Sequence, residues 1–189
     1  MAKQFRQISD AHRAFIEAQH IFFVATAAPE GRVNVSPKGM DALRVLGPNR
    51  IVWLNLTGSG NETAAHLAQA NRMTLMWAGF ERVAMIMRAY GSARILHPGE
   101  DGWQELPEAL TSQLGARQVF DMKVDILQTS CGYGVPYFDY AGERDTLKKW
   151  AEDRGEDGLR TYWHERNARS IDGFATDFEA PDNDPDNDA

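Results

Sequence analysis

The sequence is poor in the features that mark membrane and secreted proteins. Its 189 residues include one cysteine, Cys131, which excludes a disulfide within the chain. No apolar run approaches the roughly 18 residues that a membrane-spanning helix needs. The N-terminal stretch MAKQFRQISD lacks the apolar centre of a signal peptide. We therefore expect a soluble, cytoplasmic protein without a membrane partner.

Metal-ligand spacing and an excess of basic residues are also missing. The five histidines form no HxH or HExxH pattern and the chain has no CxxC, so no metal site is predicted. Six acids among residues 177–189 account for all but one unit of the net charge of −7. The rest of the chain is therefore almost neutral, and neither nucleic acid nor an anionic surface is an expected partner.

Short apolar runs separated by tight turns dominate the first two thirds of the chain. Such runs indicate antiparallel strands rather than strand–helix–strand units. In the longest run, Gly91 marks a position where a sheet can bend or bulge. The predicted strands are Ile21–Ala27, Arg32–Ser36, Ala42–Leu46, Arg50–Leu56, Arg72–Ala78, Ala84–Leu96 and Arg117–Gln128.

Helical patterns flank these strands and fill the C-terminal part. Ser9 or Asp10 can cap a first helix, and further helices are expected over Glu62–Ala70 and Pro107–Leu114. ERDTLKKWAEDRG and GLRTYWHERNARS predict two amphipathic helices, whose charges around Arg154 are read as solvated.

The expected fold is mainly β with helices (α+β), a β-barrel of about six or seven strands with helices packed outside it. We predict a barrel domain over residues 1–140 and a helical C-terminal extension over residues 141–176. Residues 177–189 form an acidic tail that cannot bury enough apolar surface to become ordered.

The stretch LTGSGNETAAHL, from Leu56 to Leu67, places a glycine-rich turn between a strand and a helix but contains no Lys or Arg. Such a turn can hold a phosphate on its free N–H groups. It can equally be a plain helix cap, in which Ser59 or Asn61 satisfies these N–H groups and Glu62 complements the helix dipole.

The same stretch also comes close to a dinucleotide fingerprint. Gly58, Gly60 and Thr63 nearly match GxGxxG, and Glu81 lies at about the offset of a ribose-binding acid. The preceding runs are too close together for helical crossovers, which argues against a nicotinamide-binding fold.

Lys38, in the turn VSPKG, is the nearest candidate for the missing positive charge. The default for such a lysine is a solvated side chain, but a rigid turn can also present it to a phosphate. Arg88 interrupts an apolar strand, and if buried it needs an anionic partner, either a ligand or an acid of another subunit. Trp77 and Phe80 either belong to the core or flank a planar ring.

Cys131, in the loop TSCGYGVP, raises the alternative of a nucleophile. A nucleophilic thiol needs a base, and no histidine spacing provides one. The other interpretation is that Cys131 is a small apolar residue in a turn that the neighbouring glycines permit.

Four stretches in order, IFFVATAAPEGRVNVSPKG, RIVWLNLTGSGNETAAHLAQANRMTLMW, RAYGSARIL and QTSCGYGVPYFDYAGERDTLKKWAE, resemble the pyridoxamine 5′-phosphate oxidase-related family. The resemblance runs from about Ile8 to Ile171. It implies a split β-barrel that binds FMN, as a homodimer with the flavin in a groove shared by the subunits. Deazaflavin and haem binders share this barrel.

The resemblance also implies a set of cofactor-binding positions. The turn and helix of TGSGNET would lie at the flavin phosphate, and VSPKG beside the phosphate and ring. Segments matching Trp77–Phe80 and Arg88 would come near the flavin, often from the partner subunit. The expected cofactor-binding residues are Ser36, Lys38, Asn55, Ser59, Gly60, Asn61, Thr63, Trp77 and Arg88.

The chain departs from enzymes of this family that oxidise pyridoxamine phosphate. Those enzymes carry an Arg-Lys pair where this chain has Glu62 and Thr63, and an Arg/Trp/His-rich C-terminal segment without a counterpart here. We expect an FMN-dependent oxidoreductase acting on a small molecule, with Tyr133 and Cys131 as the first catalytic candidates. The alternatives are a non-catalytic flavin- or ligand-binding protein and a true pyridoxamine 5′-phosphate oxidase.

Overall fold

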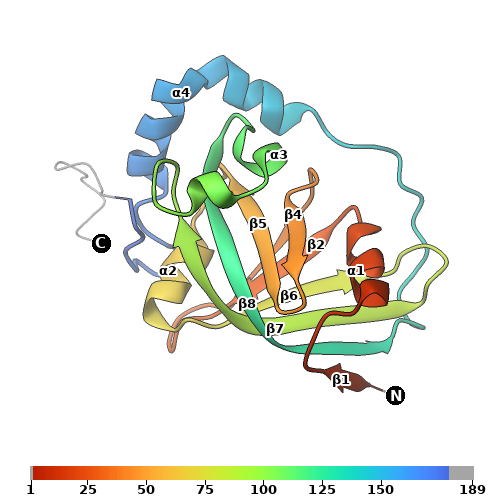
Figure 1. Ribbon diagram of the computed structural model, residues 1–189. Helices are drawn as coiled ribbons and strands as arrows, with labels where there is room; N and C mark the ends of the chain where they lie inside the picture. Colours follow the sequence, from red (N-terminus) through yellow and green to blue (C-terminus); the bar gives the residue numbers. More distant parts are fainter. Residues whose placement is uncertain (1, 179–189) are drawn as a thin grey trace.

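A computed structural model describes residues 2–178, in which a single antiparallel sheet is closed into a split barrel with helices around it (Figure 1). The strand order is β3-β2-β6-β7-β8-β5-β4, and β1 pairs with β8 beside this path. The strands are β1 (Lys3–Phe5), β2 (Phe22–Thr26), β3 (Asn34–Lys38), β4 (Leu43–Gly47), β5 (Arg50–Leu56), β6 (Met73–Ala78), β7 (Met85–Leu96) and β8 (Ala116–Cys131). The helices are α1 (Asp10–Glu17), α2 (Glu62–Gln69), α3 (Glu108–Thr111) and α4 (Thr146–Arg166).

The two longest strands, β7 and β8, hold the barrel together. β8 pairs with β7 over most of its length, with β5 through its first half and with β1 through its second half. The register of β7 and β8 shifts between Tyr90 and Gly91. At Gly91 a Cβ would lie 1.9 Å from the carbonyl oxygen of Lys123. The expected irregularity at Gly91 is therefore confirmed, and it lets the two backbones approach where the strands bend.

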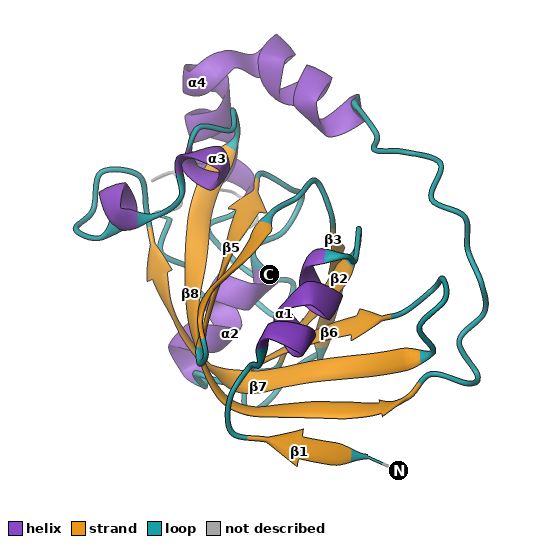
Figure 2. Ribbon diagram, turned by 45° about the vertical axis from the view of Figure 1, so that its right-hand side comes forward, coloured by secondary structure: helices purple, strands orange, loops and turns teal. Residues whose placement is uncertain are grey.

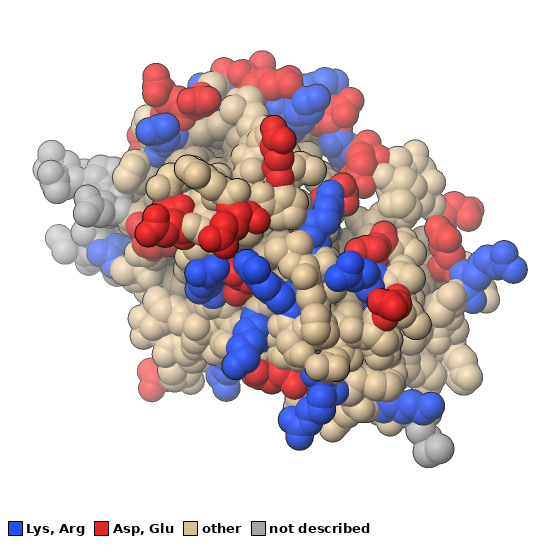
Figure 3. Space-filling view, viewed as in Figure 1, with Lys and Arg blue, Asp and Glu red and all other residues tan. Residues whose placement is uncertain are grey.

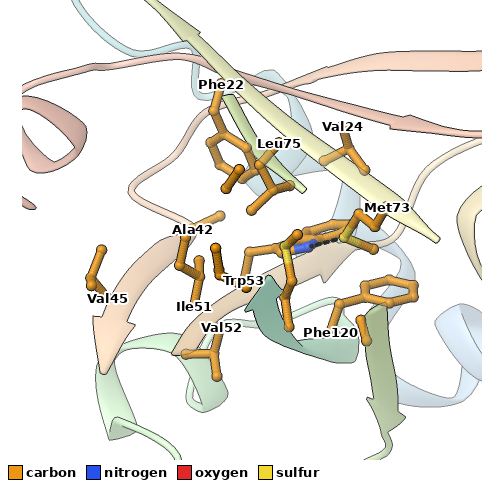
Figure 4. Packing of buried hydrophobic residues seen from close by; sticks show 14 of the residues in the cluster. Phe22, Val24, Ala42, Val45, Ile51, Val52, Trp53, Met73, Leu75 and Phe120 are labelled. Carbon is orange, nitrogen blue, oxygen red and sulfur yellow. Dashed lines mark hydrogen bonds between the residues drawn. The ribbon is translucent and has the colours of Figure 1, made fainter. Parts of the chain in front are cut away.

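Aromatic and aliphatic side chains fill the barrel (Figure 4). The Trp53 ring stacks on Phe120 with centroids 4.4 Å apart, and its Nε1 lies 3.5 Å from the sulfur of Met73. Five successive residues of β5 are buried, because the barrel interior covers one face of this strand and other elements cover the opposite face. The long apolar run RIVWLNL is typical of such a strand.

All seven predicted strands are present, but an eighth, β1, was missed. Its three residues, Lys3–Phe5, show no buried alternation. The helix expected over Pro107–Leu114 is shorter in the structure, where only Glu108–Thr111 (α3) is α-helical. A 3-10 turn at Trp103–Glu105 precedes it. The two predicted C-terminal helices are the two halves of α4, which is broken at Gly155 with φ of 66°. Ser9 caps α1 as expected, by accepting a hydrogen bond from the His12 N–H.

Charged side chains of both signs are intermixed over the face shown in Figure 3, without a broad basic area. No helix within residues 2–178 is both long and apolar enough to cross a membrane. Of the predicted acidic tail, residues 179–189 lie outside the described residues, while Asp177 and Phe178 contact His97.

Substituting Gly91 tests the close approach of β7 and β8. Gly91→Ala should destabilise the protein by about 1–3 kcal/mol, because the new methyl group collides with backbone that cannot move away cheaply. Gly134→Ala is the matched control, since nothing lies within 4 Å of its Cβ position. Equal melting temperatures for the two variants would contradict this account.

Candidate functional site

A cavity of about 1550 Å³ opens between the barrel, α1 and the C-terminal part of the chain. One wall comes from the end of β3, including Lys38, and from the turn Thr57–Ser59. The facing wall comes from α4 and from residues 138–144 of the long loop that joins β8 to α4 (Figure 2). Most of the lining surface is apolar, as in binding pockets for organic ligands, and charged residues of both signs lie on the wall.

The turn before α2 is fastened from behind by the C-terminal end of α4. Trp163 Nε1 donates a hydrogen bond of 2.8 Å to Thr57 Oγ1, and Asn167 Nδ2 donates one of 3.0 Å to the Gly58 carbonyl. Asn167 is fully buried. The glycine-rich turn therefore has a fixed shape although it contains two glycines.

The buried Arg117 of β8 completes this fastening. Its guanidinium donates to the Gly60 carbonyl at 3.1 Å and to Asn167 Oδ1. Arg117 is only 2% exposed, and no carboxylate within the described residues forms an ion pair with it. Burial lowers the pKa of Arg117 to about 10, with Asp177 and Tyr162 opposing the shift. This cation was missed by the sequence analysis, since it occupies an ordinary position in a strand pattern.

Fixing these carbonyls also fixes the neighbouring N–H groups. In a planar trans peptide the N–H points opposite to the C=O. The N–H groups of Ser59 and Asn61 therefore point away from Asn167 and Arg117. No acceptor within the described residues bonds to them. With the free N–H groups at the start of α2, they form a set of donors reinforced by the helix dipole.

Lys38 is an unpaired cation on the barrel side of the cavity wall. Its ammonium lies 5.8 Å from the centre of the Trp53 ring and makes no hydrogen bond or ion pair with any described residue. Burial, together with the charge of Arg117, lowers the pKa of Lys38 to about 8. An anion in the cavity would relieve this unfavourable environment.

The backbone directly after Lys38 is strained. Met40 and Asp41 are non-glycine residues with φ of 58° and 52°. Such residues each cost on the order of 1 kcal/mol in this region. Arg44 fastens the turn through two hydrogen bonds to the Asp41 carboxylate, at 2.7 and 2.6 Å. Met40 lines the cavity, so the strained turn forms part of its wall.

The side chains of Asn61, Glu62 and Thr63 contact other protein groups and do not line the cavity. Asn61 is the N-cap residue of α2, but its side chain bonds to Gln118 at 3.3 and 3.4 Å, so the expected side-chain cap by Asn61 is wrong. Thr63 Oγ1 accepts a hydrogen bond of 3.4 Å from Asn34. Glu62 Oε1 accepts the Ile171 N–H at 3.0 Å, and Glu62 does not line the cavity.

The remaining predicted site residues lie elsewhere in this chain. Trp77 is 1% exposed and belongs to the barrel core. Arg88 is half-buried on β7 opposite Gln128, without an ion pair among the described residues. The catalytic candidates are exposed at the end of β8 and after it. None of the following lines the cavity: Ser36, Asn55, Trp77, Arg88, Cys131 and Tyr133.

The loop after β8 closes the cavity through aromatic contacts that the sequence analysis did not anticipate. The Tyr140 ring stacks on His20 with centroids 3.6 Å apart, and the Phe138 ring lies 5.2 Å from Phe80. The Phe138 N–H also donates to the Phe80 carbonyl at 3.0 Å. These contacts hold residues 138–144 against the barrel side of the cavity.

Comparison with known proteins agrees with this architecture. A family model described as pyridoxamine 5′-phosphate oxidase matches residues 8–131, about two thirds of the chain. The chain therefore belongs to this family. It is 33% identical over 190 residues to the pyridoxamine 5′-phosphate oxidase family protein ustO of Aspergillus flavus, covering 90% of this chain and 76% of that protein.

Solved structures support the fold. A HupZ variant from Group A Streptococcus has a TM-score of 0.54 at 18% identity, covering 65% of this chain and 99% of HupZ. A pyridoxamine 5′-phosphate oxidase candidate from Lactobacillus delbrueckii has a TM-score of 0.50 at 15% identity, covering 65% of this chain and 94% of that chain. The predicted split barrel is confirmed.

The contact between His97 and Asp177 makes stability depend on pH. Hydrogen bonding and the charge of Asp177 raise the pKa of His97 above its ordinary value, and nearby Glu100 acts in the same direction. The contact should therefore stabilise the fold fully below about pH 6.5, and the gain, on the order of 0.5–1 kcal/mol, should be lost as pH rises through the higher folded-state pKa.

Melting curves recorded across this pH range test the assignment. The difference between wild type and His97→Gln should shrink as pH rises, and Asp177→Asn should behave in the same way. A difference that is constant with pH would contradict the pairing.

Proposed function

We propose that the protein is an FMN-binding flavoprotein that acts as an oxidoreductase on a small molecule. The observation that carries the proposal is the unpaired, half-buried Lys38 beside the fixed turn Thr57–Ser59 in one cavity. Membership of the pyridoxamine 5′-phosphate oxidase family supports it.

The residues present fit the phosphate end of FMN. A phosphate dianion needs several N–H donors and positive charge, and is well placed at a helix N-terminus. The Ser59 N–H and hydroxyl, on the cavity wall, would supply donors. Lys38 would supply the charge at the wall, and Arg117 would add a positive field from behind the turn. This set replaces the Arg-Lys pair that Glu62 and Thr63 do not provide.

The apolar part of the cavity suits a planar ring. Phe15, Phe23, Phe80 and Met85 line it. The volume of about 1550 Å³ exceeds the common range for a single small ligand, so a cofactor and a substrate can be held together. Bound FMN would supply a ring that accepts and releases a hydride. The protein would orient this ring and exclude water through the loop that carries Phe138 and Tyr140.

Flavin binding is tested on the purified protein. We expect flavin absorption bands, or quenching of FMN fluorescence on titration. The absence of both signals would refute the cofactor assignment. Reduction by NAD(P)H with turnover would support an enzyme over a non-catalytic binder. Pyridoxamine phosphate should not support oxygen consumption, since the Arg-Lys pair is missing; consumption with this substrate would reverse that part of the proposal.

Lys38 should control affinity for the flavin phosphate. Lys38→Ala is expected to weaken FMN binding by about 1.5–3 kcal/mol, roughly 10- to 150-fold, because a charge-assisted contact is lost. Affinity of the wild type should also fall as pH rises above about 8, where free Lys38 loses its proton. Lys123→Ala, an exposed lysine of β8, is the control. Unchanged FMN affinity in Lys38→Ala would exclude the assigned role.

We also propose a homodimer in which the outer face of β7 and β8 meets the partner subunit. Arg88 supports this, since it is half-buried on that face, between Met76 and Gln128 in register, and lacks an ion pair within the described residues. A second chain would offer it a partner. Light scattering should give twice the chain mass, and Arg88→Glu should shift the protein toward the monomer. A monomeric wild type would refute the dimer.

A further inference from the structure

Arg154 of α4 is an exposed residue whose guanidinium packs against two aromatic rings on the cavity wall, and these rings stand nearly perpendicular to each other. Its guanidinium carbon lies 4.6 Å from the centre of the Trp150 ring and 5.0 Å from that of Tyr162. All three side chains line the cavity that also contains Lys38 and Ser59. Cation–π contacts of this kind orient a guanidinium while leaving its N–H groups free at the edge.

The bend in α4 builds this arrangement. In a continuous helix Trp150 and Tyr162 would be about 18 Å apart along the axis. Their ring centroids are in fact 5.2 Å apart. Gly155, with φ of 66°, breaks the helix directly after Arg154, and the second half of α4 turns away from the axis of the first (Figure 1). The bend therefore brings Tyr162 close to Trp150 and Arg154.

The guanidinium N–H groups of Arg154 are available to a ligand. No hydrogen bond or ion pair joins its guanidinium to any described residue, although the helix around it is rich in acids. The cation–π contacts restrict the guanidinium to the cavity wall, where its N–H groups can reach a ligand. A fixed, unpaired guanidinium is suited to a planar oxyanion, which it can bind through two hydrogen bonds.

Both halves of α4 contact the barrel near the turn Thr57–Ser59. Trp163, next to Tyr162, donates to Thr57, and Tyr162 is close enough to Arg117 to affect its pKa. Ala151, next to Trp150, packs 3.5 Å from the Cβ position of Gly115. Arg154 is thus held by an element fixed to the wall that it faces.

We propose that Arg154, bracketed by Trp150 and Tyr162, binds an oxyanion inside this cavity. The oxyanion is either the phosphate of the flavin or a phosphate or carboxylate on a second small ligand. The first source rests on the proposed FMN binding, whereas the second does not.

Chemical protection of Arg154 tests this in the full-length protein. Phenylglyoxal modifies accessible guanidinium groups, and mass spectrometry of peptides gives the rate at each site. Arg160, exposed on the same helix but not on the cavity wall, is the internal control. The probes are FMN, riboflavin, which lacks the phosphate, and inorganic phosphate added with and without FMN.

Each outcome separates the possibilities. Protection of Arg154 by FMN but not by riboflavin would show that the bound oxyanion is the flavin phosphate. Protection by inorganic phosphate in FMN-saturated protein assigns a second anionic ligand. If FMN does not bind at all, protection by inorganic phosphate alone still supports the oxyanion site while the flavin proposal fails. Equal modification of Arg154 and Arg160 under every condition overturns the inference.

A variant pair separates binding from stability. Arg154→Gln should weaken the protecting ligand about tenfold, as expected for loss of a charged donor, and Arg160→Gln should not. Arg154→Lys keeps the charge but not the planar fork, and should restore part of the affinity. If Arg154→Gln lowers only the melting temperature and leaves ligand affinity unchanged, the arginine is purely structural.

Discussion

The buried guanidinium of Arg117 is the constraint on which the proposed site depends. Removing a charge from water is costly unless its donors are satisfied. Here the partners are a backbone carbonyl, that of Gly60, and the amide of Asn167 instead of a carboxylate. No carboxylate of the described residues forms an ion pair with the guanidinium, although the charge of Asp177 opposes the fall in its pKa, and Nε is buried without a hydrogen-bond partner among them. A turn that is flexible by composition becomes rigid, and it lies in the field of this cation.

The C-terminal extension acts as part of the site and not as an appendage. Trp163 and Asn167 fix the turn, and the Ile171 N–H donates to Glu62 Oε1. Arg32 and Asp172 add a further ion pair between the barrel and this segment. Barrel and extension therefore share one set of interactions.

The barrel could be predicted from the sequence because its strands have strong local patterns. RIVWLNL is buried on both faces, and Gly91 marks the irregularity in β7. β1 has no such pattern, since three exposed residues carry no alternation. The site is harder to predict because its parts meet only in three dimensions. Arg117 lies 57 positions after Gly60, the residue of the turn to which it donates. In the sequence Arg154 resembles any solvated helix charge, and only the bend at Gly155 brings Tyr162 against it.

The part of the chain that matches the family model ends at residue 131, whereas the outer wall of the cavity begins at Phe138. The barrel side of the cavity, with Lys38 and Ser59, is thus encoded before residue 131, and the facing wall is encoded by the stretch that follows. Changes confined to the later stretch would alter one wall of the cavity without disturbing the packing of the barrel core.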